Sequence, residues 1–236
     1  MLKLFILSLI SFGILFNVLA QSIDSEFIKC IKLKKVSKIE ELVDGGFDVN
    51  KRFKYDDTPL MFAAAEGNVE IAELLISRGA KVDAKNEDGR TAIAIAVMME
   101  HEDMVKLLIK NSAILGIEDN NDKTPLIWAV YKNNLEIIKL IVFAGVDINK
   151  QNKYGRTAIM EAACLGFTDV IKLLFSEGAK LHFKDKNNAT AVTLAREFKH
   201  DEAENLLYDL GGAYTTPAVS QKELIEEFVP QELLKD

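Results

Sequence analysis

The feature that most constrains this 236-residue chain is a repeat with a period of 33 residues. Threonine, alanine, leucine and glycine all return with this period, and several independent rows in one register indicate true copies. Because one copy is too short to enclose an apolar core, neighbouring copies must bury their apolar faces against one another. The sequence therefore predicts a stack of repeats rather than a globule built around a pocket. The threonine row comprises Thr58, Thr91, Thr124, Thr157 and Thr190.

Each copy predicts two short helices followed by an extended loop. Thr58-Pro59 and Thr124-Pro125 are typical of a helix start, with threonine at the N-cap and proline in the first turn. The i, i+3, i+4 spacing of apolar residues over 71–75 predicts a second amphipathic helix. Gly79 fits the left-handed residue that ends this helix. Turn residues such as Asp88-Gly89 then close the loop.

The segment TPLMFAAAEGNVE at 58–70 resembles the ankyrin repeat, and GAKVD at 79–83 resembles its loop. The resemblance implies an all-α fold, an α-solenoid of about six ankyrin-like repeats, each a helix-turn-helix with a β-hairpin-like loop, preceded by a signal peptide. The expected boundaries are 1–20 for the signal peptide, 21–55 for a degenerate N-terminal capping repeat, 56–88, 89–121, 122–154, 155–187 and 188–220 for the repeats, and 221–236 for a capping helix and tail.

Some positions depart from the family pattern. The family's histidine is replaced throughout, so its threonine–histidine hydrogen bond is absent and apolar packing is expected to replace most of it. The third copy is the least regular, because Glu100 and Ser112 stand where other copies have glycine. A left-handed residue other than glycine costs about 1 kcal/mol, so we expect this copy to be the softest internal segment. The residues in place of the histidine are Met61, Ala94, Ile127, Met160 and Thr193.

Residues 1–20 differ in kind from the rest. Lys3 precedes an apolar run from Leu4 to Leu19, and small or compact residues lead to Ala20. This pattern is typical of a secretory signal peptide cut after Ala20; an uncleaved membrane anchor is the alternative, although the run is shorter than the roughly 20 residues of a span. We expect an exported protein, periplasmic or secreted, of bacterial source, without membrane contact after cleavage.

Charge and cysteine content limit the partners. A net charge of −7 disfavours nucleic acid, and the lysines over 29–38 are read as a solvated capping face. Cys30 belongs to the alanine row and should be buried, whereas Cys164 lies several repeats away. No disulfide is therefore expected, and an exposed Cys164 or an intermolecular bridge is the alternative. We expect a monomer that binds a protein partner.

A search for chemistry finds no catalytic or metal motif. None of His101, His182 and His200 has a partner at metal-binding spacing, and neither nucleophile nor phosphate-binding motifs occur. The acidic loops at 87–88 and 118–122 lack the EF-hand pattern of a calcium site. We therefore expect no cofactor, no metal and no enzymatic activity, with an enzyme of unrecognised site as a remote alternative.

Candidate binding residues occupy the columns that vary while the scaffold columns stay alike. In the ankyrin family the matching positions line the concave groove and finger tips. Aromatic residues, Met and Arg are enriched at interface cores. We expect Tyr131, Tyr154 and Arg156 to be exposed anchors, whereas Met98, Met99 and Trp128 either extend the patch or pack between repeats. The full set is Tyr55, Arg90, Met98, Met99, Lys123, Trp128, Tyr131, Tyr154, Arg156 and Leu165.

These observations predict a non-catalytic protein–protein interaction module. Recognition would use a preformed surface, so that little ordering entropy is lost on docking. Two variants of this role are open: a regulator or protector of an exported enzyme, or a secreted effector directed at a host.

Overall fold

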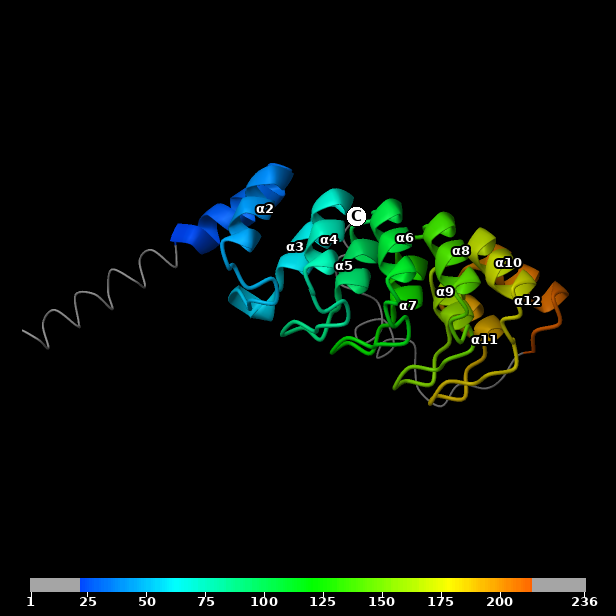
Figure 1. Cartoon of the computed structure of the whole chain (residues 1–236). Coiled ribbons are helices and arrows are strands. Elements are labelled where there is room, and N and C mark those ends of the chain that lie inside the picture. Colours follow the sequence, from blue (N-terminus) through cyan, green and yellow to red (C-terminus); the bar gives the residue numbers. More distant parts are fainter. Residues whose placement is uncertain (1–21, 214–236) are drawn as a thin grey trace, which may run out of the picture. The chain divides into compact units, whose positions relative to one another are not determined.

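The computed structural model describes residues 22–213, and the chain forms two compact units, unit 1 (Met1–Ser112) and unit 2 (Ala113–Asp236). Over the described range the chain forms helices, turns and loops without a strand (Figure 1). Unit 1 holds a helical segment at 22–32, α2 (Val36–Asp44), the 3₁₀ helix η1 (Lys54–Asp56), α3 (Pro59–Ala65), α4 (Val69–Ser77), α5 (Ala92–Met98) and α6 (Glu102–Lys110). Unit 2 holds α7 (Pro125–Tyr131), α8 (Leu135–Phe143), α9 (Ala158–Cys164), α10 (Thr168–Ser176), α11 (Ala191–Glu197) and α12 (Asp201–Asp209).

Within each unit the helices pair as hairpins, and the hairpins stack. In unit 1 the first helices of successive copies, α3 and α5, contact each other, as do the second helices α4 and α6. In unit 2, α9 contacts both α7 and α11, and α10 contacts both α8 and α12. The predicted all-α stack of helical hairpins is therefore confirmed within both units.

Alanines allow the first helices to approach closely. The members of the alanine row have no exposed surface, because each faces the first helix of a neighbouring copy. Cys30 extends this row and is 5% exposed, as expected from its register. The fully buried row is Ala63, Ala96, Ala129, Ala162 and Ala195.

The threonines start the first helices as predicted, with one difference. Four of them accept a hydrogen bond from the backbone N–H three residues later, and these four are Thr58, Thr91, Thr124 and Thr190. Thr157 occupies the N-cap of α9 without such a side-chain bond among the described residues. The missing histidine is replaced partly by polar contacts: Thr190 and Thr193 hydroxyls lie 3.1 Å apart, and Thr58 N–H donates to Met61 Sδ.

Left-handed backbone recurs with the repeat. Glu100 and Ser112 have φ values of 58° and 62°, so both adopt the conformation expected where other copies carry glycine. At the loop tips one left-handed residue per copy is the pattern, as at Asp122 and Asn188. The loop before α3 departs from it, because Tyr55 and Asp56 are both left-handed, with φ values of 63° and 59°.

Two histidines join successive copies. Nε2 of His101 lies 3.0 Å from the carbonyl oxygen of Ala65, and Nε2 of His200 lies 2.9 Å from that of Cys164. Each ring rests on a glycine of the previous copy: a Cβ at Gly67 would lie 2.7 Å from Nδ1 of His101. These histidines therefore have a structural role at the junction between hairpins.

Three expectations concern segments at the ends or the cysteines. The signal peptide at 1–20 and the capping helix at 221–236 lie outside the described residues. No helix within residues 22–213 is long and apolar enough to cross a membrane. Both cysteines are free thiols and buried; Cys164 is 3% exposed, so the alternative of an exposed Cys164 thiol is wrong.

Candidate functional site

Unit 1 contains a pocket of about 230 Å³ beside α3 and α5. Its lining combines an apolar floor with a polar edge from the loop tips. Four of the residues predicted to bind a partner meet here, namely Tyr55, Arg90, Met98 and Met99. The complete lining is Tyr55, Asp57, Met61, Phe62, Ala65, Asn86, Asp88, Arg90, Ile95, Met98 and Met99.

Helix α3 supplies one wall of the pocket and α5 the other. Ala65 is a neighbour of both Phe62 and Met61 on the surface of α3, because it follows them by three and four residues. Ile95 and Met98 share a face of α5 by the same argument, and Met99 follows at its C-cap. Met99 is 51% exposed, so an apolar side chain lies open to solvent at the mouth.

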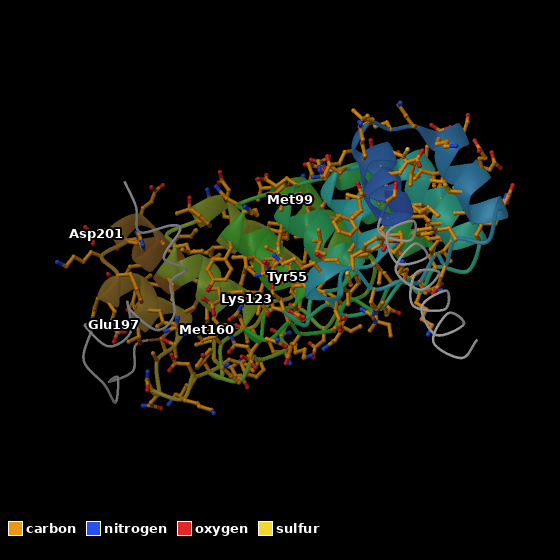
Figure 2. The ribbon with its side chains drawn as sticks, turned by 90° about the vertical axis from the view of Figure 1, so that its left-hand side faces the viewer. Tyr55, Met99, Lys123, Met160, Glu197 and Asp201 are labelled. Atoms are coloured by element: carbon orange, nitrogen blue, oxygen red, sulfur yellow. The ribbon has the colours of Figure 1, made fainter. Side chains whose placement is uncertain are left out.

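Tyr55 stands at the loop tip above this floor. Its side chain is 57% exposed, and Nζ of Lys54 lies 4.5 Å from the centre of its ring. Its carbonyl oxygen accepts a hydrogen bond from Glu87 N–H, which joins the two loop tips of unit 1. Figure 2 shows Tyr55 and Met99 on the part of the ribbon that carries α3 and α5. The left-handed backbone of a tyrosine costs free energy, and residues in such conformations occur most often at functional sites. Tyr55 is therefore the residue of the pocket that most strongly indicates a functional site.

The polar edge of the pocket is held together by Asn86. Its Oδ1 accepts from the N–H groups of Asp88 and Arg90, and its Nδ2 donates to Asp57 Oδ1 over 2.9 Å. Nη1 of Arg90 lies 3.0 Å from Asp88 Oδ2. Asp57 and Asn86 were not among the predicted binding residues. The available signal was a row of Asn or Asp with the same period, and its members are Asn86, Asp119, Asn152 and Asp185.

The same repeat positions in unit 2 are occupied by a buried charged network. Three repeats after Asp57, Phe62 and Asn86 come Arg156, Glu161 and Asp185. Nη1 of Arg156 lies 3.8 Å from Glu161 Oε2, and its Nε lies 3.4 Å from Asp185 Oδ2. Arg156 has no exposed surface. Figure 2 marks Met160 and Glu197, which correspond to Met61 and Met98 of the unit 1 pocket.

The expectation that Tyr131 and Arg156 are exposed is wrong. Tyr131 is 6% exposed and donates its hydroxyl hydrogen to Glu161 Oε2 over 3.0 Å. Arg156 also donates from Nη1 to Cys164 Sγ over 3.4 Å. A buried guanidinium needs carboxylate partners, and for Arg156 these are Glu161 and Asp185, which are also buried. Alanine at Tyr131 and Arg156 would therefore test stability before it tested binding.

Burial dominates the titration of this network. It raises the pKa of the Glu161 carboxyl, against the opposing charge of Arg156. It also raises the pKa of the Cys164 thiol to about 12, again against Arg156. Burial opposes the charge on Arg156, but the adjacent Cys164, Glu161 and Asp185 groups outweigh it and the pKa of Arg156 is raised. Since a reactive cysteine needs a lowered pKa, this thiol is suited to packing rather than to nucleophilic attack.

The other predicted residues of unit 2 are less accessible than those of unit 1. Trp128 is 8% exposed and donates from Nε1 to Asp119 Oδ2 over 3.0 Å, which agrees with packing between repeats. Nζ of Lys123 lies 5.1 Å from the centre of the Trp128 ring. Tyr154, beneath Nζ of Lys153, and Leu165, at the C-cap of α9, are half-buried.

Comparison with protein-family models gives two matches. The model described as ankyrin repeats in three copies matches residues 79–152 and 126–217. The model of the single ankyrin repeat matches residues 55–87. Together they span most of the chain.

Solved structures and curated proteins that are similar to this chain also include ankyrin repeat proteins. An ankyrin repeat domain from Acinetobacter baumannii AYE is 25% identical, with a TM-score of 0.73, over 80% of this chain and all of that one. A chain in the structure of the Bd0816 predatory endopeptidase from Bdellovibrio bacteriovorus in complex with immunity protein Bd3460 is 30% identical, with a TM-score of 0.71, over 78% of this chain and 96% of that one. The ankyrin repeat, SAM and basic leucine zipper domain-containing protein 1 of Loxodonta africana is 39% identical over 61 residues, only 13% of its length.

Proposed function

Because the chain belongs to the ankyrin repeat family, we propose that it is a non-catalytic protein that binds a partner protein through the pocket of unit 1. The observation that carries this proposal is the exposed pair Tyr55 and Met99 at the mouth of an apolar pocket. Aromatic side chains and methionine in such positions are typical anchors of protein interfaces. We name this surface, with the lining residues given above, the α3–α5 groove.

The size and construction of the groove favour a protein partner over a small ligand. Pockets for drug-sized ligands usually hold about 300–1,000 Å³, whereas this one holds about 230 Å³ and has exposed side chains at its mouth. Its walls are helices of a stacked repeat, so docking should cost little ordering of the receptor.

A binding role also agrees with the titratable groups. The charged cluster around Arg156 is closed to solvent, and its hydrogen bonds link successive copies. These features suit a scaffold, and the open surface suits recognition.

Site-specific photo-cross-linking tests the proposal. A benzoylphenylalanine introduced at Met99 of the full chain should cross-link one partner in the native source, because its side chain lies at the mouth of the groove. The matched control carries it at Phe143, which is 79% exposed on α8. Equal cross-linking of one protein from both positions, or none from Met99, would count against the α3–α5 groove as the docking surface.

A second candidate function is that of a protector or regulator of an exported enzyme. It is supported by the similarity to a chain from an endopeptidase–immunity protein complex. The cross-linked partner decides between the two roles. Recovery of a peptidase whose activity falls when the purified chain is added would support the protective role, and recovery of a protein without enzymatic activity would oppose it.

We also propose that the chain is exported and cut after Ala20, which rests on the sequence of residues 1–20. Mass spectrometry of the protein from its native source should find Gln21 at the N-terminus and the protein outside the cytoplasm. An intact N-terminus in the membrane fraction would favour the anchored alternative.

A further inference from the structure

We infer that the partner presents to the α3–α5 groove a segment in which one large apolar side chain is flanked by lysine or arginine. This inference rests on the proposed function and specifies its partner. It follows from the charge around the groove, its capacity and the nature of its floor.

Acidic groups predominate at the groove. Asp57 and Asp88 line it, with Arg90 as the lining cation, and Arg90 is paired with Asp88 at 3.0 Å. Glu66 and Glu100 directly follow the lining residues Ala65 and Met99 and are exposed. An exposed Glu87 lies beside Asp88, and Lys54 covers the Tyr55 ring. Such a surface attracts cationic segments and repels acidic ones.

The floor of the groove selects an apolar anchor. Met61, Met98 and Met99 are three of the six methionines of the chain, and all three line this pocket. Methionine side chains adapt to apolar groups of different shape. A volume of about 230 Å³ has room for a large side chain rather than for a folded element. The groove should therefore accept Leu, Met or Phe without strict preference.

Tyr55 sets the direction from which the segment enters. Its ring is held at the mouth by a left-handed backbone and by the hydrogen bond from Glu87 N–H to its carbonyl oxygen. An exposed tyrosine ring also binds cations over its face, as Nζ of Lys54 already does in this structure. A lysine or arginine beside the anchor would meet both this ring and the carboxylates.

The test is selection from a phage-displayed library of random dodecapeptides on the immobilised full chain. Selected peptides should be enriched in Lys and Arg within a few positions of Leu, Met or Phe, relative to the unselected library. A synthetic peptide of the selected sequence should bind about 5- to 10-fold more weakly when NaCl rises from about 50 mM to about 300 mM, because salt screens exposed charges.

Two variants separate this inference from the proposed function. Tyr55→Ala with Met99→Ala removes the anchoring surface and should abolish selection. Asp57→Asn with Asp88→Asn keeps the shape, since Asn can still accept from Asn86 Nδ2, and should weaken a selected peptide several-fold and reduce its dependence on salt. The matched control, Glu136→Gln with Asp169→Asn, removes two exposed carboxylates of unit 2 and should leave affinity unchanged.

Each outcome then has a clear meaning. Peptides that need Met99 but carry no basic residues would overturn the basic–apolar segment and leave the groove intact. Peptides that bind the Tyr55→Ala, Met99→Ala variant equally well would overturn the proposed function of the groove itself. Salt-sensitive self-association of the wild-type chain, abolished by Met99→Asp, would show that a second copy of the chain occupies the groove and would overturn the inference of a different partner. The segment that such a copy would offer is the one around Leu33, which is 53% exposed and lies among exposed lysines.

Discussion

The same repeat positions are partly exposed in unit 1 and buried in unit 2. In unit 1, Asp57, Phe62 and Asn86 contribute to an open groove with an apolar floor. Three repeats later the same columns hold Arg156, Glu161 and Asp185, which lie inside the stack. The columns that vary between copies therefore do not all belong to a binding surface. Some of them carry the internal contacts that join one copy to the next.

The contact between two of these columns is conserved in position while its chemistry changes. Asn86 Nδ2 donates to Asp57 in unit 1, and Arg156 Nε donates to Asp185 in unit 2, both over 29 residues of sequence. The arginine side chain is longer than that of aspartate, so Arg156 lies near a second carboxylate, Glu161, as well as Asp185. The presence of Glu161 and Tyr131 near Arg156 follows from its need for partners.

The largest effect is expected at Arg156. Arg156→Ala leaves the Glu161 and Asp185 carboxylates buried without their cation, and breaking a buried pair in this way costs about 3–5 kcal/mol. Hydrogen exchange measured by mass spectrometry should show faster exchange over α9–α12. The matched variant in unit 1, Asp57→Ala, loses one hydrogen bond at a half-buried position and should cost about 1 kcal/mol. Similar costs for the two variants would remove the distinction between the units.

Converting the network to its unit 1 counterpart sharpens this test. The triple variant Arg156→Asp, Glu161→Phe and Asp185→Asn should recover part of the loss. The asparagine introduced at position 185 could donate to the aspartate introduced at position 156, as Asn86 Nδ2 donates to Asp57 in unit 1, and the phenylalanine in place of Glu161 removes one buried carboxylate. Thermal unfolding of the triple variant beside Arg156→Ala measures the recovery. A triple variant less stable than the single one would show that the groove columns cannot be exchanged between units.

The next largest effect is expected where the two units agree. Gly166→Ala would place a Cβ 2.6 Å from Nδ1 of His200, in addition to a left-handed φ of +70°, and should cost about 2–4 kcal/mol. Gly67→Ala in unit 1 should cost about the same, because a Cβ there meets His101 at 2.7 Å. The control Gly178→Ala keeps a left-handed φ but has nothing within 4 Å of the new Cβ, so about 1–2 kcal/mol is expected. Urea unfolding compares the three.

A smaller effect is expected from the Cys164 thiol at alkaline pH. An acid whose pKa is raised on folding contributes stability that is complete below its unfolded pKa and is lost as pH rises toward the folded one. For Cys164 that window runs from about 9 to about 12. At pH 10 the loss should be about 1 kcal/mol. Cys164→Ala should remove this part of the decline between pH 8 and pH 10, as read from urea unfolding at each pH; an unchanged decline would oppose a buried titrating thiol.

The smallest effect distinguishes the caps. Thr124→Val in α7 loses the hydrogen bond from Ile127 N–H and should cost about 1 kcal/mol. Thr157→Val in α9 should cost less, since within residues 22–213 the Thr157 side chain makes no capping bond. Thermal unfolding of the two variants side by side gives the difference, and an equal or greater cost at Thr157 would contradict it.

Much of the fold could be predicted from the sequence because the same local pattern recurs in each 33-residue copy. The threonine, alanine and glycine rows each report one local requirement, a helix start, a close approach or a left-handed residue, and these requirements do not depend on distant residues. The structure confirms the helix start at Thr58, the buried Cys30 and the left-handed Glu100.

The candidate site could be predicted only in part. Tyr55, Arg90, Met98 and Met99, which variation and residue type indicate as surface residues, line one pocket, and their binding of a partner stays a prediction. Arg156 was misjudged because the burial of a charged side chain depends on partners in two neighbouring copies, and the 33-residue register does not reveal which copy supplies them. Considering the repeat positions of Glu161 and Asp185 together would have indicated two carboxylates within reach of the Arg156 guanidinium.

The histidine bridges limit how copies of this chain can be rearranged. His101 needs a residue without a side chain at Gly67, in the copy before its own. A hairpin with this histidine can therefore follow only a hairpin that has glycine just after its first helix, as Gly67 follows α3. Duplication or shuffling within such a gene would have to move the two codons together, although they belong to different repeats.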